Sequence, residues 1–131
     1  MLNEAKAFLC WDALPNLSIQ LVPIQKSVAY YFPPNRELDS ILLFYDAHQH
    51  DFSESIFLLF HEAGHAQQYE RLGKIFHNMI SVPNGKERRS FEREAWSFAK
   101  ILFEKFVTKF DLENSLLEKF DQYAAMSLDS Y

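Results

Sequence analysis

The chain has 131 residues, of which 48% are hydrophobic and 24% are charged, a balance typical of a folded globular protein and not of a disordered one. Its formal net charge of −5 argues against general binding to nucleic acid or to an anionic membrane, which requires a basic surface. The 13 phenylalanines predict a core packed with aromatic rings. No linker or repeat divides the chain, so we expect one domain over residues 1–131.

The first predicted element is a helix over residues 2–14. Apolar residues recur there at helical spacing and stop before Pro15, which disfavours helical backbone in the residue that precedes it. Cys10 lies in this segment and is the single cysteine of the sequence, so an intramolecular disulfide is excluded. Because its neighbours are apolar, we interpret Cys10 as a small core residue and not as a nucleophile.

Three short strands are predicted next. They cover residues 17–22, 28–32 and 41–45. The first alternates apolar and polar residues, the second is rich in β-prone residues, and the third is a continuous apolar run typical of a buried strand. Pro33 and Pro34 close the second strand, and Asn35 continues the turn. Short strands with tight turns predict a small, mostly antiparallel sheet.

The pattern then changes to helical spacing. Asp51 and Glu54 have the spacing of a capping box, which predicts a helix over residues 52–72 that ends at Gly73. Gly64 lies inside this helix, where glycine costs about 1 kcal/mol relative to alanine. A helix that keeps such a residue is expected to let another segment approach closely.

Two further helices are predicted after an irregular segment at residues 74–87, which contains a turn at 83–85. The first covers residues 88–109. Asp111 is expected to cap the second. Its apolar stripe comprises Leu112, Leu116, Leu117, Phe120 and Tyr123.

Basic residues gather near the start of the 88–109 helix. They are Lys86, Arg88, Arg89 and Arg93, and they alternate with Glu87, Glu92 and Glu94. Alternating charge of this kind predicts a solvated helix start and argues against a nucleic-acid surface.

The segment His61-Glu62-Ala63-Gly64-His65 is the strongest indication of chemistry. Residues four apart on a helix lie one above the other, so the imidazoles of His61 and His65 can reach one ion. Glu62 could accept a proton from a water that the ion activates, as in HExxH metalloproteases. A buried polar cluster without partners would be costly, which favours metal binding. We interpret the segment as half of a hydrolytic zinc site.

A hydrolytic zinc site usually has three protein ligands and leaves one position to water. In compact HExxHxxGxxH sites a histidine follows shortly after the motif, but Gln68 and Arg71 occupy the motif's glycine and histidine positions. The third ligand must therefore come from elsewhere. His77 in the irregular segment is one candidate, and a glutamate on the 88–109 helix is the other.

Glu92 is favoured among the glutamates. Ala95 follows it by three residues, so it lies on the same helical face and is small enough to let two helices meet. Glu94 is the competing residue. It lies about 200° around the helix from Glu92, so only one of the two can face the metal.

These residues resemble a known group. The motif HEAGH at 61–65, followed by Glu92-x-x-Ala95 and then by Phe98, Ala99 and Leu102, looks like the glutamate-zincins. It is most similar to the small ImmA/IrrE-type metallopeptidases, although Trp96 stands where that group has asparagine. The resemblance implies an α+β, zincin-like fold, in which an active-site helix and a glutamate-bearing helix cover a small sheet.

The resemblance also implies roles. His61, His65 and Glu92 would bind Zn²⁺, and Glu62 would be the general base of a metallopeptidase. The substrate would be a protein or peptide, and such enzymes often act on a regulatory protein. The alternative is a non-hydrolytic, zinc-binding regulatory or interaction protein. Glu62 favours hydrolysis because a closed structural site usually has four protein ligands and needs no base. A metal-free helical interaction module is a third interpretation.

The remaining expectations concern the other histidines, membrane segments and the cellular compartment. His48 and His50 lie in a polar loop, and we favour surface histidines over a second metal site. No stretch approaches 18 apolar residues, and the first residues lack the pattern of a signal peptide. We expect a cytoplasmic protein without a membrane segment.

Overall fold

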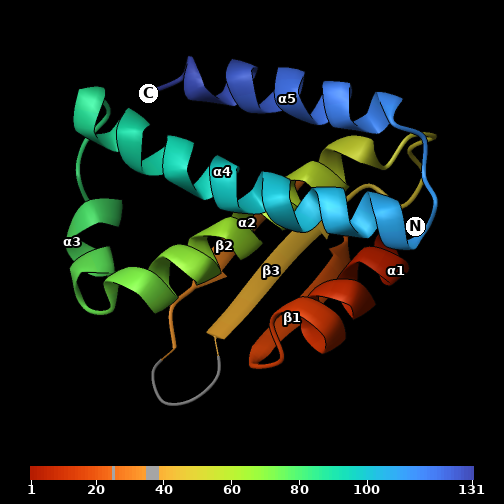
Figure 1. The fold of residues 1–131 in the computed structure, drawn as a ribbon, viewed down its shortest axis with the longest axis horizontal. Helices are drawn as coiled ribbons and strands as arrows, with labels where there is room; N and C mark the ends of the chain where they lie inside the picture. Colours follow the sequence, from red (N-terminus) through yellow and green to blue (C-terminus); the bar gives the residue numbers. More distant parts are fainter. Residues whose placement is uncertain (25, 35–38) are drawn as a thin grey trace.

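The computed structural model describes residues 1–24, 26–34 and 39–131 and is a mixed α and β structure (Figure 1). In chain order the elements are α1 (Leu2–Ala7), the π-helical segment η1 (Phe8–Ala13), β1 (Leu17–Pro23), β2 (Val28–Phe32), β3 (Asp39–Tyr45), α2 (Ser53–Leu72), α3 (Ile75–Ile80), α4 (Lys86–Lys109) and α5 (Ser115–Leu128). Asn35, which was expected to continue the turn after β2, lies outside the described residues.

The three strands form a mixed sheet in the order β1-β3-β2. β3 pairs with β1 in parallel, with Ile19 opposite Ile41, and with β2 in antiparallel orientation, with Tyr30 opposite Leu42. The expectation of a mostly antiparallel sheet is therefore wrong for one of the two pairings. Every residue of β3 is at least partly buried, so this apolar strand takes the central position between β1 and β2.

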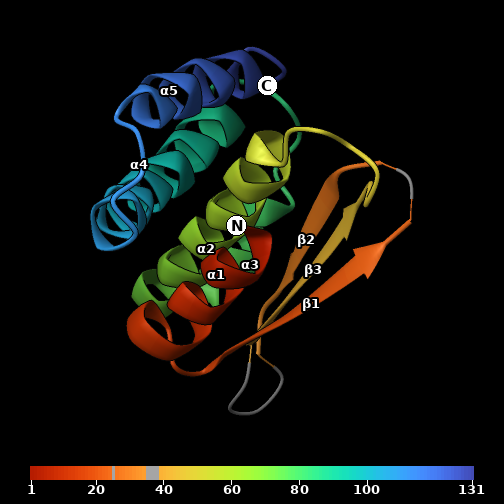
Figure 2. The same ribbon diagram turned by 90° about the vertical axis from the view of Figure 1, so that its right-hand side faces the viewer.

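The helices lie on one side of the sheet (Figure 2). α2 packs on β2 and β3, α4 crosses α2, and α5 packs on α4. Ile41 and Leu43 of β3 are fully buried beneath the helices, at 1% and 0% exposure. Tyr30 and Phe32 of the edge strand β2 remain half-exposed. The sheet therefore supplies a floor for α2 and leaves β2 as an accessible edge.

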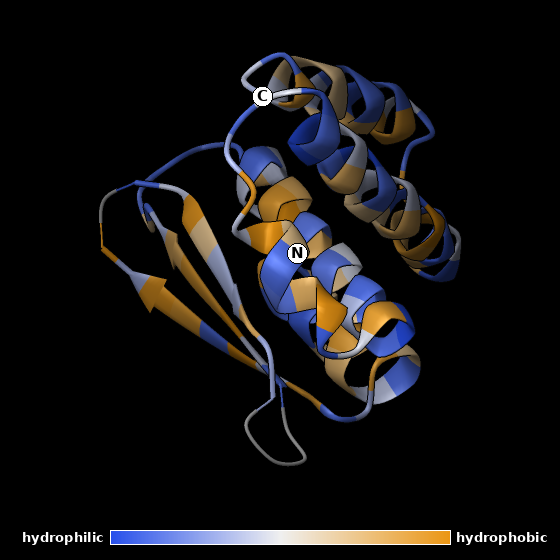
Figure 3. Ribbon diagram, turned by 90° about the vertical axis from the view of Figure 1, so that its left-hand side faces the viewer, coloured by the Kyte–Doolittle hydropathy of each residue, from blue (hydrophilic) through white to orange (hydrophobic). Residues whose placement is uncertain are grey.

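Hydrophobic residues run along the strands, whereas the helices carry hydrophobic and hydrophilic residues on different sides (Figure 3). Phenylalanine rings from α2, α4 and α5 meet in the core, as expected from the composition. The ring centroids of Phe60 and Phe103 lie 5.2 Å apart, and those of Phe103 and Phe120 lie 4.8 Å apart. Contacts of this kind add to the gain from burial and hold α2 and α4 in one arrangement.

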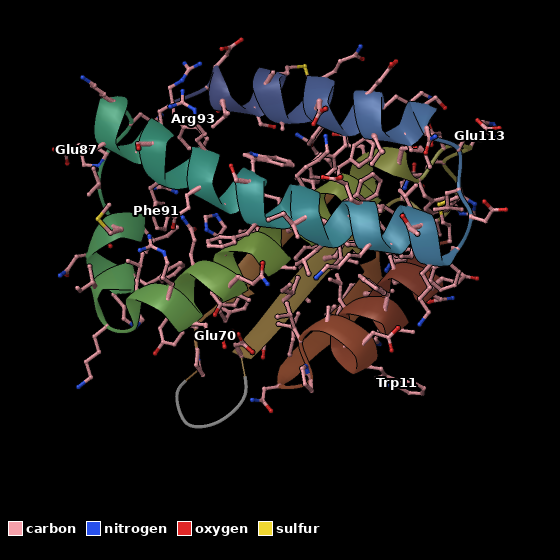
Figure 4. All side chains as sticks on the ribbon, in the orientation of Figure 1. Trp11, Glu70, Glu87, Phe91, Arg93 and Glu113 are labelled. Atoms are coloured by element: carbon pink, nitrogen blue, oxygen red, sulfur yellow. The ribbon has the colours of Figure 1, made fainter. Side chains whose placement is uncertain are left out.

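The N-terminal helix covers nearly the predicted range but changes its pitch. The amide of Leu14 donates to the carbonyl of Leu9 at 2.8 Å, a bond across five residues that is typical of a π-helical turn. The helical segment ends before Pro15, as expected. Trp11 lies on this segment, and its side chain is 83% exposed and extends from the surface (Figure 4).

The start of α2 is close to its predicted position, but the expected capping box does not form. Asp51 Oδ1 accepts hydrogen bonds from the amide of Ser53 at 2.9 Å and from its hydroxyl at 2.6 Å. Glu54 instead accepts a hydrogen bond from the hydroxyl of Tyr123 on α5 at 3.3 Å. Asp51 lies one residue before the N-cap, so its side chain reaches Ser53 first. Gly73 ends the helix with φ 60°, as predicted.

Two expectations in the second half of the chain are wrong. The segment predicted to be irregular contains α3, because Phe76 is buried at 1% exposure and anchors a helical turn. Asp111 does not cap α5, which begins at Ser115 after Asn114. Asp111 has φ 51° and ends α4, where the amide of Leu112 donates to the carbonyl of Val107 at 2.9 Å.

Gly64 lies where α2 and α4 cross, which confirms the expected close approach. A β-carbon at this position would lie 2.1 Å from the carbonyl oxygen of Ala95 and 3.0 Å from its carbonyl carbon. These are backbone atoms of α4 and cannot turn aside as a flexible side chain would. The two helices can therefore keep this separation only with glycine at position 64.

We predict that Gly64→Ala destabilises the fold. The new methyl group overlaps the backbone of Ala95, and overpacking of this kind costs about 3 kcal/mol or more. Alanine regains about 1 kcal/mol of helix propensity, so the free energy of unfolding should fall by about 2 kcal/mol or more. Urea denaturation followed by circular dichroism measures this change. Glu70→Ala, at an exposed position of α2, is the control and should shift stability by less than about 0.5 kcal/mol.

Candidate metal centre

The crossing of α2 and α4 brings together His61 and His65 of α2 and Glu92 of α4. His61 Nε2 lies 3.2 Å from Glu92 Oε1, and His65 Nε2 lies 3.1 Å from Glu92 Oε2. One ligand atom from each residue lies within 4.8 Å of the others, and all three side chains are buried. We call these residues the His-His-Glu group. It could bind a metal ion.

Local structure explains why these three side chains converge. The histidines are one helical turn apart on the face of α2 that meets α4, and Gly64 lies between them at the crossing. On α4, the backbone of Ala95 contacts Gly64, and Glu92 precedes Ala95 by about one turn on the same face. The neighbouring Phe91 also lies on the inner side of α4 (Figure 4) and packs on His65, with ring centroids 5.4 Å apart. The close crossing thus places the carboxylate against both imidazoles.

The alternative third ligands lie elsewhere. Glu94 accepts two hydrogen bonds from Nη2 of Arg71, at 2.6 and 2.7 Å, near the surface. His77 is exposed on α3, and His48 and His50 are exposed in the loop after β3. Within residues 1–24, 26–34 and 39–131, none of these side chains joins the His-His-Glu group.

The donor set fits a transition-metal ion. Two imidazole nitrogens and a carboxylate oxygen are ligands that zinc and related ions accept. The separations of 3.1 and 3.2 Å are close to the roughly 3.3 Å expected between atoms that bind one tetrahedral zinc ion. Glu92 Oε2 is buried and lies 3.1 Å from His65 Nε2 and 3.6 Å from Arg88 Nε, but it accepts a hydrogen bond from neither. A buried carboxylate oxygen without a hydrogen bond is costly, and a bound cation would remove that cost.

The ionisation of the His-His-Glu group also favours the binding of a cation. Burial lowers the pKa of His61 to about 4, which keeps its imidazole neutral, the form that binds metals. Burial alone would raise the pKa of Glu92, but contacts with both histidines hold it well below its usual range. Burial likewise opposes a charge on His65, yet Glu92 and Glu62 outweigh it and raise its pKa. A bound cation would favour the neutral imidazole of His65 with Nε2 unprotonated, because metals bind the deprotonated nitrogen.

Gln68 orients the ring of His65. Its amide nitrogen donates to the carbonyl of Phe91 at 2.7 Å, so its oxygen is the acceptor for His65 Nδ1, also at 2.7 Å. His65 Nδ1 therefore carries the hydrogen, and Nε2 is free for a ligand. In the sequence, Gln68 was notable only as the residue at the glycine position of the compact HExxHxxGxxH motif. Its position three residues after His65, on the same helical face, could have indicated this role.

Packing, more than hydrogen bonding, holds the ring of His61. The ring of Trp96 is stacked on it with centroids 4.2 Å apart and an interplanar angle of 25°. His61 Nδ1 finds no hydrogen-bond partner among the described residues. Trp96 is buried at 5% exposure and follows Glu92 by one helical turn. The residue that departs from the ImmA/IrrE-type motif thus contacts one of the predicted ligands.

A pocket of about 370 Å³ opens beside the His-His-Glu group. Its lining includes His61, Glu62, His65, Arg88, Glu92 and Tyr131. Burial raises the pKa of Glu62 to about 7, so its carboxyl can both accept and donate a proton near neutral pH. The edge strand β2 contributes Ala29, Tyr30 and Tyr31 to the pocket wall. Glu62 and the group therefore face one common space.

Arg88 and Tyr131 were missed as parts of this site. The expectation of a solvated helix start is wrong for Arg88, which donates to the carbonyl of Ile80 at 2.7 Å and reaches into the pocket. Its Nε lies 3.6 Å from Glu92 Oε2. Because Arg88 precedes Glu92 by four residues, helical spacing could have placed it on this face. No signal in the sequence points to Tyr131, which follows the C-terminal end of α5 and hydrogen-bonds Glu92.

Comparison with known proteins does not assign the chain to a family. No family model, curated protein or solved structure matches the chain. Among the described residues, no helix is both long enough and apolar enough to cross a membrane. The geometry of the site is therefore the main guide to function.

Proposed function

We propose that the protein is a zinc-dependent metallopeptidase of the HExxH type with a zincin-like fold. His61, His65 and Glu92 would hold the zinc ion, and Glu62 would be the general base. The observation that carries this proposal is that Glu62 and the His-His-Glu group face the same open pocket. A site with three protein ligands on one side and a pocket on the other is typical of catalytic zinc and not of structural zinc.

Each residue of the site would have a separate role in the reaction. A bound zinc ion would act as a Lewis acid toward the scissile carbonyl and toward water. Glu62 would take a proton from that water and return it to the leaving amine, which requires a pKa near the working pH. Gln68 and Trp96 would keep the two imidazoles in their binding orientations.

The edge of the sheet supports a peptide substrate. β2 pairs with β3 on one side, and its Ala29 and Tyr31 line the pocket. An extended peptide could add to the free side of β2 as a further strand, with main-chain hydrogen bonds that do not depend on its sequence. This placement would bring the scissile bond to the pocket that the His-His-Glu group borders.

Zinc removal tests the proposal. We expect the purified protein to carry about one zinc ion per chain and to cleave members of a peptide library derived from bacterial or eukaryotic proteins. Treatment with a chelator should abolish cleavage, and added Zn²⁺ should restore it, because the ion supplies the Lewis acid. Mass spectrometry of the library identifies the cleaved bonds. Zinc-loaded protein that cuts no library peptide and no captured protein would contradict the peptidase.

A non-hydrolytic zinc protein is the second candidate. The observation in its favour is that Tyr131 and Arg88 approach Glu92 from the pocket and reduce the space for a substrate. Such a protein would bind zinc and a partner but would not cleave the partner. A pull-down with the Glu62→Gln variant separates the two functions, because a substrate captured by this variant is cut by the wild-type protein and a mere partner is not.

A further inference from the structure

We infer that Tyr131 is a positioning residue for Glu92, and that α5 and the residues after it are therefore part of the metal centre. The inference rests on the metal-binding role proposed for the His-His-Glu group. The hydroxyl of Tyr131 donates a hydrogen bond to Glu92 Oε1 at 2.9 Å. This is the same oxygen that lies 3.2 Å from His61 Nε2. Tyr131 and His61 thus both contact Oε1 of the Glu92 carboxylate.

Arg88 completes this arrangement. Its guanidinium carbon lies 5.4 Å from the centre of the Tyr131 ring, a cation–π distance, and its Nε faces Glu92 Oε2 at 3.6 Å. Nη1 of Arg88 is held by the carbonyl oxygens of Ile80 and Val82. The arginine is therefore fixed, and it supports both the ring of Tyr131 and the second oxygen of Glu92.

Two contacts hold the segment that carries Tyr131 against the start of α4. The side-chain amide of Asn84 donates to the carbonyl of Ser130 at 3.3 Å. Nη2 of Arg89 lies 3.3 Å from Asp129 Oδ1 in an ion pair. These contacts are near the surface and individually weak. Together with the stacking on Arg88 they direct the hydroxyl of Tyr131 into the pocket.

The other tyrosines of the pocket do not share this role. Tyr31 donates its hydroxyl to Asp39 at 3.0 Å, and Tyr30 is 49% exposed on β2. Among the described residues, Tyr131 is the tyrosine whose hydroxyl bonds to the His-His-Glu group. Groups that hydrogen-bond a metal ligand fix its orientation, and their loss typically weakens metal binding about 10- to 100-fold.

The test is a zinc titration of Tyr131→Phe against a chromophoric chelator. The variant keeps the ring over Arg88 and loses the hydroxyl, so we expect zinc affinity to fall about 10-fold while the thermal unfolding midpoint stays within a few degrees. Tyr123→Phe is the matched control. It also removes a tyrosine hydroxyl from α5, but one that bonds to Glu54 away from the pocket, so its zinc affinity should equal that of the wild type.

Two results would overturn the inference. The first is unchanged zinc affinity in Tyr131→Phe; if kcat falls at the same time, the hydroxyl acts on the substrate alone. The second is an equal loss of zinc affinity in Tyr123→Phe. The titration is independent of cleavage. Wild-type protein that binds zinc without cutting peptides would contradict the peptidase, whereas a selective loss in Tyr131→Phe would still support the positioning role.

Discussion

His61→Ala is expected to lose its bound zinc. The substitution removes one of three proposed ligands, whereas loss of a mere partner of a ligand costs about 10- to 100-fold in affinity. We therefore expect zinc affinity to fall by more than about 100-fold. The substitution also removes the stacking on Trp96 and the contact of Nε2 with Glu92, so circular dichroism must show that the variant is folded. Zinc content after gel filtration and a chelator titration measure the loss.

His77→Ala is the control for this experiment. His77 is exposed on α3, and it was a candidate third ligand in the sequence. The structure places it outside the His-His-Glu group, so its removal should leave one zinc ion per chain. Full zinc retention in His61→Ala, or an equal loss in His77→Ala, would refute the ligand assignment.

Glu62→Gln is expected to keep zinc and to lose cleavage. Glutamine has nearly the same shape as glutamate but cannot take a proton from water, and general-base catalysis contributes about 10²- to 10⁴-fold to rates. We therefore expect kcat on a library-derived peptide to fall by that factor. KM and zinc content should change little, because Glu62 is not among the three proposed ligands.

Glu70→Gln is the matched control, since Glu70 lies on the exposed side of the same helix. It should cleave at the wild-type rate. If Glu62→Gln cleaves as fast as the wild type, Glu62 is not the base. If it loses zinc as well as activity, the measurement cannot be read as loss of a base alone, and Glu62 would then belong with the ligands.

The sequence predicted most of the elements, because their signals are local. The positions of α2 and of β2 follow from apolar spacing and from the residues at their ends, and both agree with the structure within one residue. The sheet topology was wrong in part. Strand pairing depends on which strand is buried most completely, and local alternation does not report that.

Local spacing likewise indicated some of the functional residues and missed others. His61, His65 and Glu92 could be selected by helical spacing and by the small residues Gly64 and Ala95. Arg88 was misjudged because its charged neighbours suggested solvent, although its spacing from Glu92 allowed a contact.

The 3.6-residue period of the helix shows from the sequence which side chains share a helical face. It therefore indicated the two histidines, the glutamate between them, and Glu92 as the favoured third ligand. Only the folded chain shows that α4 crosses α2 at Gly64, which brings Glu92 to both imidazoles. The same holds for the hydrogen bond from the hydroxyl of Tyr131, after the end of α5, to Glu92. Contacts between distant segments depend on the packing of the whole core, and no local pattern specifies them.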